Sequence, residues 1–141
     1  MNVREVMTAQ VATASPRTTI REVAQTMVKV ESGAVPVVDD GKVVGLITDR
    51  DIVIRVVAEG GSLDTPAAEV MTEGVETCRE DDNVADATGK MASKQIRRLV
   101  VLDEQGRMAG ILSLGDVAVD YGAKAVGKTL EAISENTPAA H

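Results

Sequence analysis

Residues 45–51, with the sequence GLITDRD, contain the pattern that organises this chain, because it returns at residues 110–116 as GILSLGD. In both copies a glycine and two apolar residues lead to a hydroxyl residue, and an aspartate follows three positions later. The sequence EVMT at residues 5–8 is also repeated, at residues 69–72. A unit this short buries too little surface to be stable alone, so we expect the two copies to pack on each other. Pseudo-twofold packing would create two related clefts between them.

Each copy is predicted to fold as β-α-β-β-α, so the chain belongs to the α+β class. Thr19 and Glu22 fit a capping box that opens a helix, and Asn83 is the candidate cap of the matching helix in the second copy. Pro36 lies inside a predicted strand, which places it at an edge or beside a bulge. The predicted elements are extended pieces at 11–13 and 75–77, helices from 20 and from 84, strands at 34–38, 43–47, 99–102 and 108–112, and helices at 49–57 and 114–121.

The domain boundaries follow from this repeat. We expect the first repeat at residues 1–58, a linker at 59–66, the second repeat at 67–122, a C-terminal helix at 123–134 and a disordered tail at 135–141. Residues 122–129 satisfy the phosphate-loop pattern GxxxxGK[ST]. A predicted helix precedes them instead of a strand, however, so we interpret them as a loop followed by a capped helix.

The composition excludes several classes of function. The net charge is −7 and 1% of the 141 residues are aromatic, which argues against nucleic acid, because phosphates are repelled and bases find few rings to stack on. No signal core or membrane-spanning apolar run is found, so we expect a cytoplasmic protein without a membrane partner. One cysteine, Cys78, and one histidine, His141, allow neither a disulfide framework nor a zinc site. No catalytic residue, metal or required cofactor is predicted.

The hydroxyl and the carboxylate of the repeated motif have two interpretations. In the structural one, Thr48 and Ser113 are helix N-caps, followed by an acid in the first turn. In the functional one, free N–H groups at the helix start bind a phosphate, and an aspartate accepts hydrogen bonds from two adjacent sugar hydroxyls. The N-cap explains the hydroxyls well. It explains less well why both copies keep the aspartates Asp51 and Asp116.

A strand that ends in G-h-h-[ST]-x-x-D, where h is apolar, resembles the hallmark of the cystathionine-beta-synthase (CBS) domain. The strands at residues 33–39 and 96–103 and the entries VMT at 6–8 and 70–72 are also similar to that family. The resemblance covers residues 3–58 and 67–122. It implies a stand-alone pair of CBS repeats, a Bateman module, of the kind that commonly binds adenosine-containing nucleotides in the two clefts between repeats.

By position, the resemblance implies a role for individual residues. Asp51 and Asp116 would bind ribose hydroxyls. The remaining residues divide into those that would face phosphates, namely Thr48, Arg50, Ser113, Arg97 and Arg98, and those that would line the adenine pockets, namely Val11, Ala12 and Val75, with Gly33 and Ala34 nearby.

The two copies differ at several of these positions. Gly33 and Ala34 correspond to Arg97 and Arg98, and Arg50 corresponds to Gly115. Glu76 stands where the first copy has Ala12, which puts an acid near one cleft. The two clefts therefore need not bind the same ligand, and one of them could be empty.

The function implied by the resemblance is a non-catalytic ligand-sensing module. An adenine nucleotide such as AMP, ADP or ATP, with or without magnesium, would bind between the repeats and regulate an unidentified protein partner in trans. The alternative is a homodimerising protein-interaction module with no physiological nucleotide, whose interface would be the exposed faces of the predicted helices at 49–57 and 114–121.

Overall fold

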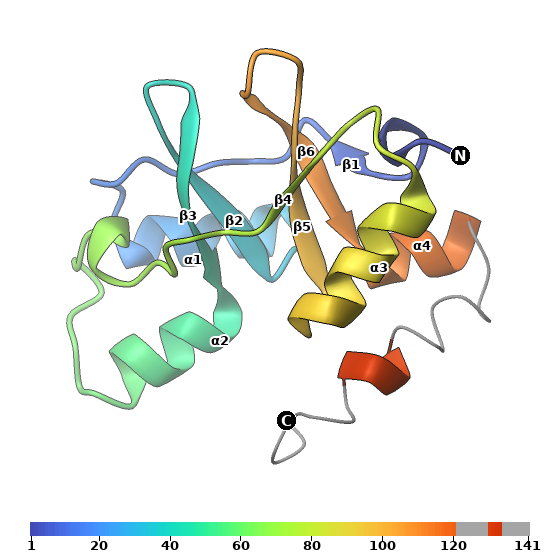
Figure 1. Ribbon diagram of the computed structural model, residues 1–141. Coiled ribbons are helices and arrows are strands. Elements are labelled where there is room, and N and C mark those ends of the chain that lie inside the picture. The colour runs from blue at the N-terminus through green and yellow to red at the C-terminus, as the bar shows by residue number, and fades with distance from the viewer. Residues whose placement is uncertain (121–129, 134–141) are drawn as a thin grey trace. The chain divides into compact units, whose positions relative to one another are not determined.

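The computed structural model describes residues 1–120 and 130–133 (Figure 1). The chain divides into two compact units: unit 1 consists of Met1–Gln10 and Glu76–His141, and unit 2 of Val11–Val75. Each unit contains the helices and the hairpin of one repeat. The short segment that precedes them in the sequence belongs to the opposite unit: residues 1–10 to unit 1 and residues 67–75 to unit 2. Predicted repeats and compact units are thus two different divisions of the chain.

Unit 2 consists of a helix, a hairpin and a second helix. Oγ1 of Thr19 accepts a hydrogen bond from the Glu22 N–H and opens the first helix, as predicted. Glu31 ends that helix in the left-handed conformation. The elements are α1 (Ile20–Val30), β2 (Ala34–Asp39), β3 (Lys42–Thr48), α2 (Asp49–Ile52), its π-helical continuation η2 (Val53–Val57) and the short η3 (Ala67–Glu69).

The hairpin of unit 2 accommodates Pro36 without losing a hydrogen bond between its two strands. The Pro36 carbonyl accepts from Ala14 N at 2.9 Å, on the side away from β3. The N and C=O of one strand residue point the same way, so the missing N–H also faces away from β3. The ladder register shifts between Val37 and Val38. Pro36 therefore lies beside a bulge, as predicted.

Unit 1 has the same helix and hairpin, within a four-stranded sheet of order β1-β6-β5-β4. β4 runs parallel to β5, and the other two pairings are antiparallel. The Asn83 side chain accepts from Ala85 N and caps the helix, as predicted. The elements are η1 (Val3–Glu5), β1 (Thr8–Ala9), β4 (Thr77–Arg79), α3 (Val84–Lys94), β5 (Arg98–Leu102), β6 (Met108–Ser113) and α4 (Leu114–Asp120).

In each unit the segment from the opposite repeat pairs with the second hairpin strand beside a glycine. In unit 1, Ala9 of β1 pairs with Gly110 of β6. In unit 2, Thr72 and Leu46 exchange two backbone hydrogen bonds of 2.9 and 3.0 Å. A Cβ on Gly110 would collide with the Thr8 carbonyl oxygen, and a Cβ on Gly45 with the Met71 side chain. The glycine that opens each repeated motif therefore permits this close approach.

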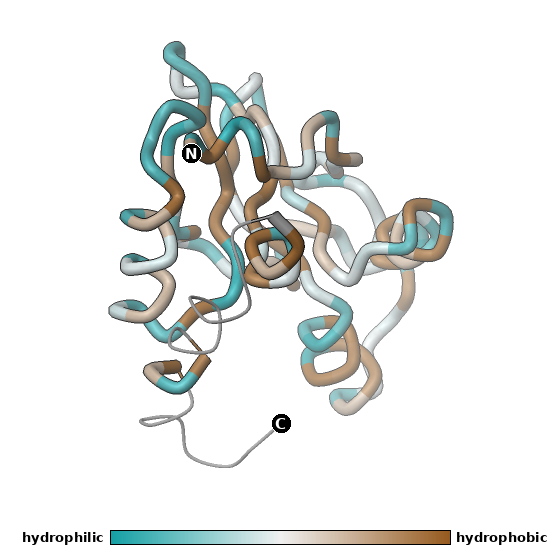
Figure 2. The backbone as a smooth tube through the Cα atoms, turned by 90° about the vertical axis from the view of Figure 1, so that its right-hand side faces the viewer, coloured by the Kyte–Doolittle hydropathy of each residue, from teal (hydrophilic) through white to brown (hydrophobic). Residues whose placement is uncertain are grey.

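Each unit has its own aliphatic core. Figure 2 shows hydrophilic and hydrophobic residues alternating along the helices, as expected where one face is buried. The buried residues of α1 and α3 recur at helical spacing, for example Val84, Ala87 and Met91. The largest fully buried side chains are Ile20, Val23, Val35, Val37, Ile47 and Val56 in unit 2, and Val3, Val84, Met91, Leu99, Val100 and Leu112 in unit 1.

The predicted α+β class and the β-α-β-β-α order are confirmed. The extended pieces predicted at 11–13 and 75–77 begin later than predicted: Ala14 pairs with Val37 in unit 2, and β4 of unit 1 overlaps the second prediction only at Thr77. The predicted helix at 123–134, the phosphate-loop pattern and the tail lie outside the described residues, except that 130–133 are helical. None of the helices within 1–120 and 130–133 is long and apolar enough to cross a membrane.

Candidate functional site

The hairpin of unit 1 brings two arginines beside the repeated motif. Arg98 begins β5 and pairs in register with Ser113, which ends β6. The Leu114 N–H donates to the Arg97 carbonyl at 3.1 Å. These bonds fix the start of one strand against the end of the next, so Arg97 and Arg98 lie next to Ser113 although Arg98 and Ser113 are 15 positions apart in the sequence.

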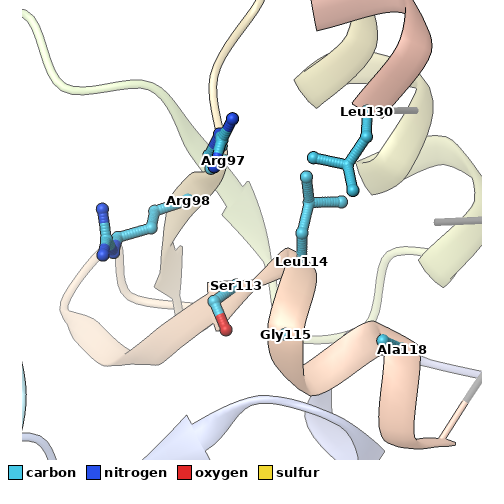
Figure 3. A pocket seen from close by; sticks show the side chains of 7 residues that line it. All are labelled: Arg97, Arg98, Ser113, Leu114, Gly115, Ala118 and Leu130. Carbon is cyan, nitrogen blue, oxygen red and sulfur yellow. The ribbon is translucent and has the colours of Figure 1, made fainter. Parts of the chain in front are cut away.

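A cavity of about 390 Å³ opens at this point, and we call it the arginine cavity. Its volume lies within the range of small-molecule sites, roughly 300–1,000 Å³. In Figure 3 the two arginines lie on one side of the cavity, and Leu114 and Leu130 face each other on the other. Cations and a hydroxyl thus share the cavity with apolar side chains. It is lined by Arg97, Arg98, Ser113, Leu114, Gly115, Ala118 and Leu130.

Both arginines are available to an anion. Their side chains are exposed, and among residues 1–120 and 130–133 no carboxylate forms an ion pair with either of them. Two other arginines of unit 1 are engaged: Arg4 pairs with Glu80 at 3.2 Å, and Arg79 donates to two carbonyls. A guanidinium group suits a phosphate, because it presents several N–H donors in a planar fork.

Asp116 lies next to the arginine cavity without lining it. Its N–H donates to Ser113 Oγ at 3.2 Å, so Ser113 caps α4, and one carboxylate oxygen accepts from Thr8 Oγ1 at 3.3 Å. Thr8 belongs to the segment that comes from the other repeat. Sequence reasoning did not include Thr8 among the site residues, although the repeated VMT entry could have identified it.

The equivalent motif in unit 2 forms a complete capping box. The Asp51 N–H donates to Thr48 Oγ1 at 3.2 Å, and the Thr48 N–H donates to Asp51 Oδ2 at 2.9 Å. The other carboxylate oxygen lies 3.9 Å from an Arg55 nitrogen, and Arg55 also donates to the Val70 carbonyl. The structural interpretation of this hydroxyl and this acid is therefore confirmed in unit 2, and one Asp51 oxygen is already occupied.

Gly33 and Ala34 occupy the place in unit 2 that the arginines hold in unit 1. Ala34 pairs with Thr48, and the Asp49 N–H donates to the Gly33 carbonyl at 2.9 Å. The Asp49 carboxylate lies so close to Gly33 that a Cβ there would be 2.8 Å from Oδ2. Arg50 is exposed and its N–H donates to Asp49 Oδ1. This position is thus acidic where its counterpart is basic.

The residues expected to line the adenine pockets are not part of the arginine cavity. Val11, Ala12 and Val75 are partly buried and belong to unit 2. The Glu76 carboxylate lies 3.6 Å from Lys90 Nζ and 3.9 Å from Lys94 Nζ in unit 1. Two lysines of α3 therefore balance the charge of Glu76. This acid repels an anionic ligand less than an isolated carboxylate would.

Chemistry by Cys78 has no structural support. The side chain is buried, and its burial raises the pKa of the thiol to about 11, so it stays protonated near neutral pH. His141 lies outside the described residues. In the part of the chain that the structure describes, no group of three or more His, Cys, Asp or Glu residues could hold a metal ion.

Comparison with known proteins finds one family along most of the chain. The family model of the CBS domain matches residues 3–58 and 67–120. The CBS domain-containing protein YhcV of Bacillus subtilis is 44% identical over 119 residues, which cover 84% of this chain and 84% of that protein.

Solved structures with ligands have the same fold. The CBS domain protein PAE2072 from Pyrobaculum aerophilum, complexed with AMP, has a TM-score of 0.78 and 26% identity and covers 92% of this chain and 98% of its own. The CBS domain pair of protein MJ0100, in complex with 5′-methylthioadenosine and S-adenosyl-L-methionine, has a TM-score of 0.77 and 30% identity and covers 88% and 98%.

Proposed function

Because the chain belongs to the CBS-domain family, we propose that it is a non-catalytic sensor of adenosine-containing ligands and that, where such a ligand carries a phosphate, the arginine cavity binds that phosphate. The observation that carries this proposal is that Arg97 and Arg98 lie beside Ser113 in a cavity of about 390 Å³ and form no ion pair with any residue that the structure describes. The ligands of PAE2072 and MJ0100, namely AMP, 5′-methylthioadenosine and S-adenosyl-L-methionine, share an adenosine group. They support that class of ligand for this chain.

The proposal gives each part of the cavity a role. Arg97 and Arg98 bind phosphate oxygens through charge-assisted hydrogen bonds, and Ser113 donates its hydroxyl to the same group. The apolar side chains of Leu114, Ala118 and Leu130 contact the less polar part of the ligand. Asp116, held by Thr8, binds ribose hydroxyls. Asp51 does the same in unit 2, through the carboxylate oxygen that does not cap the helix. Placement of the ligand between the repeats remains a prediction from the resemblance.

Regulation requires more than binding. A ligand shifts a conformational equilibrium only by its difference in affinity for the two states. We therefore propose that ligand binding shifts the conformation of this chain and that a protein partner in trans responds to the shift.

Titration calorimetry with AMP, ADP, ATP, 5′-methylthioadenosine and S-adenosyl-L-methionine, each with and without magnesium, tests the proposed binding. We expect AMP to bind, and expect the double variant R97A/R98A to bind it at least tenfold more weakly. R107A is the matched control, because Arg107 is an exposed arginine at the far end of the same hairpin. Equal loss of affinity in R107A, or no adenosine compound bound by the wild type, would contradict the proposal.

A second candidate function, homodimerisation without a nucleotide, has one supporting observation. Val53, Ile54 and Val57 are 57%, 45% and 64% exposed on η2, and exposed apolar side chains of this size gathered on one helix are typical of contact surfaces. Light scattering on the purified chain, with Val57→Glu as the disrupting variant, tests this candidate. A dimer that gives no calorimetric response to any adenosine compound would favour it over the sensor.

A further inference from the structure

The two units have the same backbone arrangement where the arginine cavity lies in unit 1. Ala34 pairs with Thr48 as Arg98 pairs with Ser113. The Asp49 N–H donates to the Gly33 carbonyl at 2.9 Å, as the Leu114 N–H donates to the Arg97 carbonyl at 3.1 Å. Hydrogen bonding therefore identifies Gly33 with Arg97 and Asp49 with Leu114, independently of the sequence repeat.

The charges at these equivalent positions are opposite. Unit 1 has two arginines and a leucine. Unit 2 has Gly33, Ala34 and the Asp49 carboxylate, which lies in the space that a side chain at position 33 would enter. Arg50 does not cancel that charge from the same side, since consecutive helix residues point about 100° apart. Asp51 adds less negative charge at this position than Asp49 does, because an Arg55 nitrogen lies 3.9 Å from one of its oxygens.

Resting on the proposed function, we infer that each chain binds one phosphorylated ligand, in the arginine cavity, and that Asp49 excludes phosphate from the equivalent position of unit 2. A carboxylate repels a phosphate at contact distance, whereas an unpaired arginine attracts it. An uncharged adenosine compound does not meet this repulsion. Asp49 is thus a specificity-determining residue. Ligands that carry a phosphate bind in the arginine cavity of unit 1 and are rejected at the equivalent position of unit 2.

Transplanting the unit 1 residues into unit 2 tests the inference. Gly33 does not have a positive φ, so its backbone can carry another residue. Replacing Asp49 removes the carboxylate that the new side chain would meet. Unit 1 already has an arginine and a leucine at the two equivalent positions. Calorimetry with AMP is expected to give one equivalent per wild-type chain and two for the double variant G33R/D49L. The single variant G33R should keep one equivalent, because Asp49 would pair with the new guanidinium.

Two further variants keep the test decisive. Asp49→Asn retains an oxygen that accepts the Arg50 N–H, so it removes the charge with little risk to the fold; we expect a second, weaker equivalent of AMP. Asp40→Asn removes the same charge from the β2–β3 turn of the same unit and should leave one equivalent. Adenosine is the uncharged probe, and R97A/R98A should weaken AMP at least tenfold while changing adenosine little.

The outcomes separate this inference from the proposed function. Two equivalents of AMP on the wild-type chain, or one equivalent on both G33R/D49L and D49N, would overturn the inference and leave the sensor function standing. No binding of either AMP or adenosine by the wild type would overturn both.

Discussion

The Cys78 thiol lies in the core of unit 1 with 6% of its surface exposed. Burial, with repulsion from Asp82 as the second cause, raises its pKa from 9.0 to about 11. Between these two values the folded state holds the proton while the unfolded state releases it. This residue therefore leaves the free energy of unfolding unchanged below about pH 9 and lowers it as pH rises to about 11.

Thiolate absorbance measured against pH checks this first prediction. The native protein is expected to form the thiolate near pH 11, and the urea-unfolded protein near pH 9. C78A supplies the blank at each pH. A native thiol that titrates near pH 9 would show that the side chain is accessible to water.

The glycines that open the repeated motif should differ in their tolerance of alanine. A Cβ on Gly110 meets the backbone carbonyl of Thr8, which cannot move without breaking the β1–β6 pairing. A Cβ on Gly45 meets the Met71 side chain, which is unbranched and can change rotamer. We expect G110A to lose about 3 kcal/mol of unfolding free energy and G45A about 1 kcal/mol.

Urea unfolding of the two alanine variants measures this difference, and each variant is the control for the other. A larger loss in G45A than in G110A would contradict the contacts assigned here to β1 and Met71.

The sequence predicted residues of the site to different degrees. Arg97, Arg98 and Ser113 were named as phosphate-facing residues from the family resemblance, and they lie together because Arg98 pairs in register with Ser113 within one hairpin. Thr8 was missed, since its bond to Asp116 joins residues that are far apart in the sequence. The Gly33–Asp49 contact was missed as well, because the side-chain direction of Asp49 does not follow from spacing alone.

At the scale of elements, two helix caps of similar chemistry allow structure and binding to be separated. Thr19 caps α1 in unit 2 and is not among the residues that line the arginine cavity, whereas Ser113 caps α4 and does line it. Replacing either by alanine should cost about 1 kcal/mol of unfolding free energy, because one helix N–H loses its partner. Only S113A should also weaken AMP.

Chemical unfolding and AMP calorimetry on T19A and S113A test this prediction together, and S113T should restore both properties. Equal AMP affinity in S113A and the wild type would mean that Ser113 caps α4 but does not bind the ligand. A loss of affinity in T19A as large as that in S113A would mean that destabilisation alone explains the effect.

Helices and hairpins were predictable because their signals are local: capping residues, the 3.6-residue period and turn residues. The Asp40 and Gly41 turn, with φ of +52° and +78°, is one such signal. The extended pieces were predicted too early. Their positions depend on partners elsewhere in the chain, such as Pro36 for Ala14. The sequence of a short segment does not identify such a distant partner.

At the scale of the whole molecule, the compact units differ from the sequence repeats, and this difference has energetic consequences. Val6 and Val70 occupy the same position in the two EVMT segments. Val6 is 5% exposed in the core of unit 1, whereas Val70 is 2% exposed in the core of unit 2. Each valine therefore stabilises the hairpin of the other repeat.

The matched variants V6A and V70A test this exchange. Each removes two buried methyl groups and should cost about 2 kcal/mol of unfolding free energy, since the cavity left behind is only partly filled. Hydrogen exchange followed by mass spectrometry should show faster exchange at residues 98–113 in V6A and at residues 34–48 in V70A. The reverse assignment would mean that each repeat folds on its own entry segment. In that case Thr8 could not hold Asp116, and the proposed ribose contact in unit 1 would lose its positioning residue.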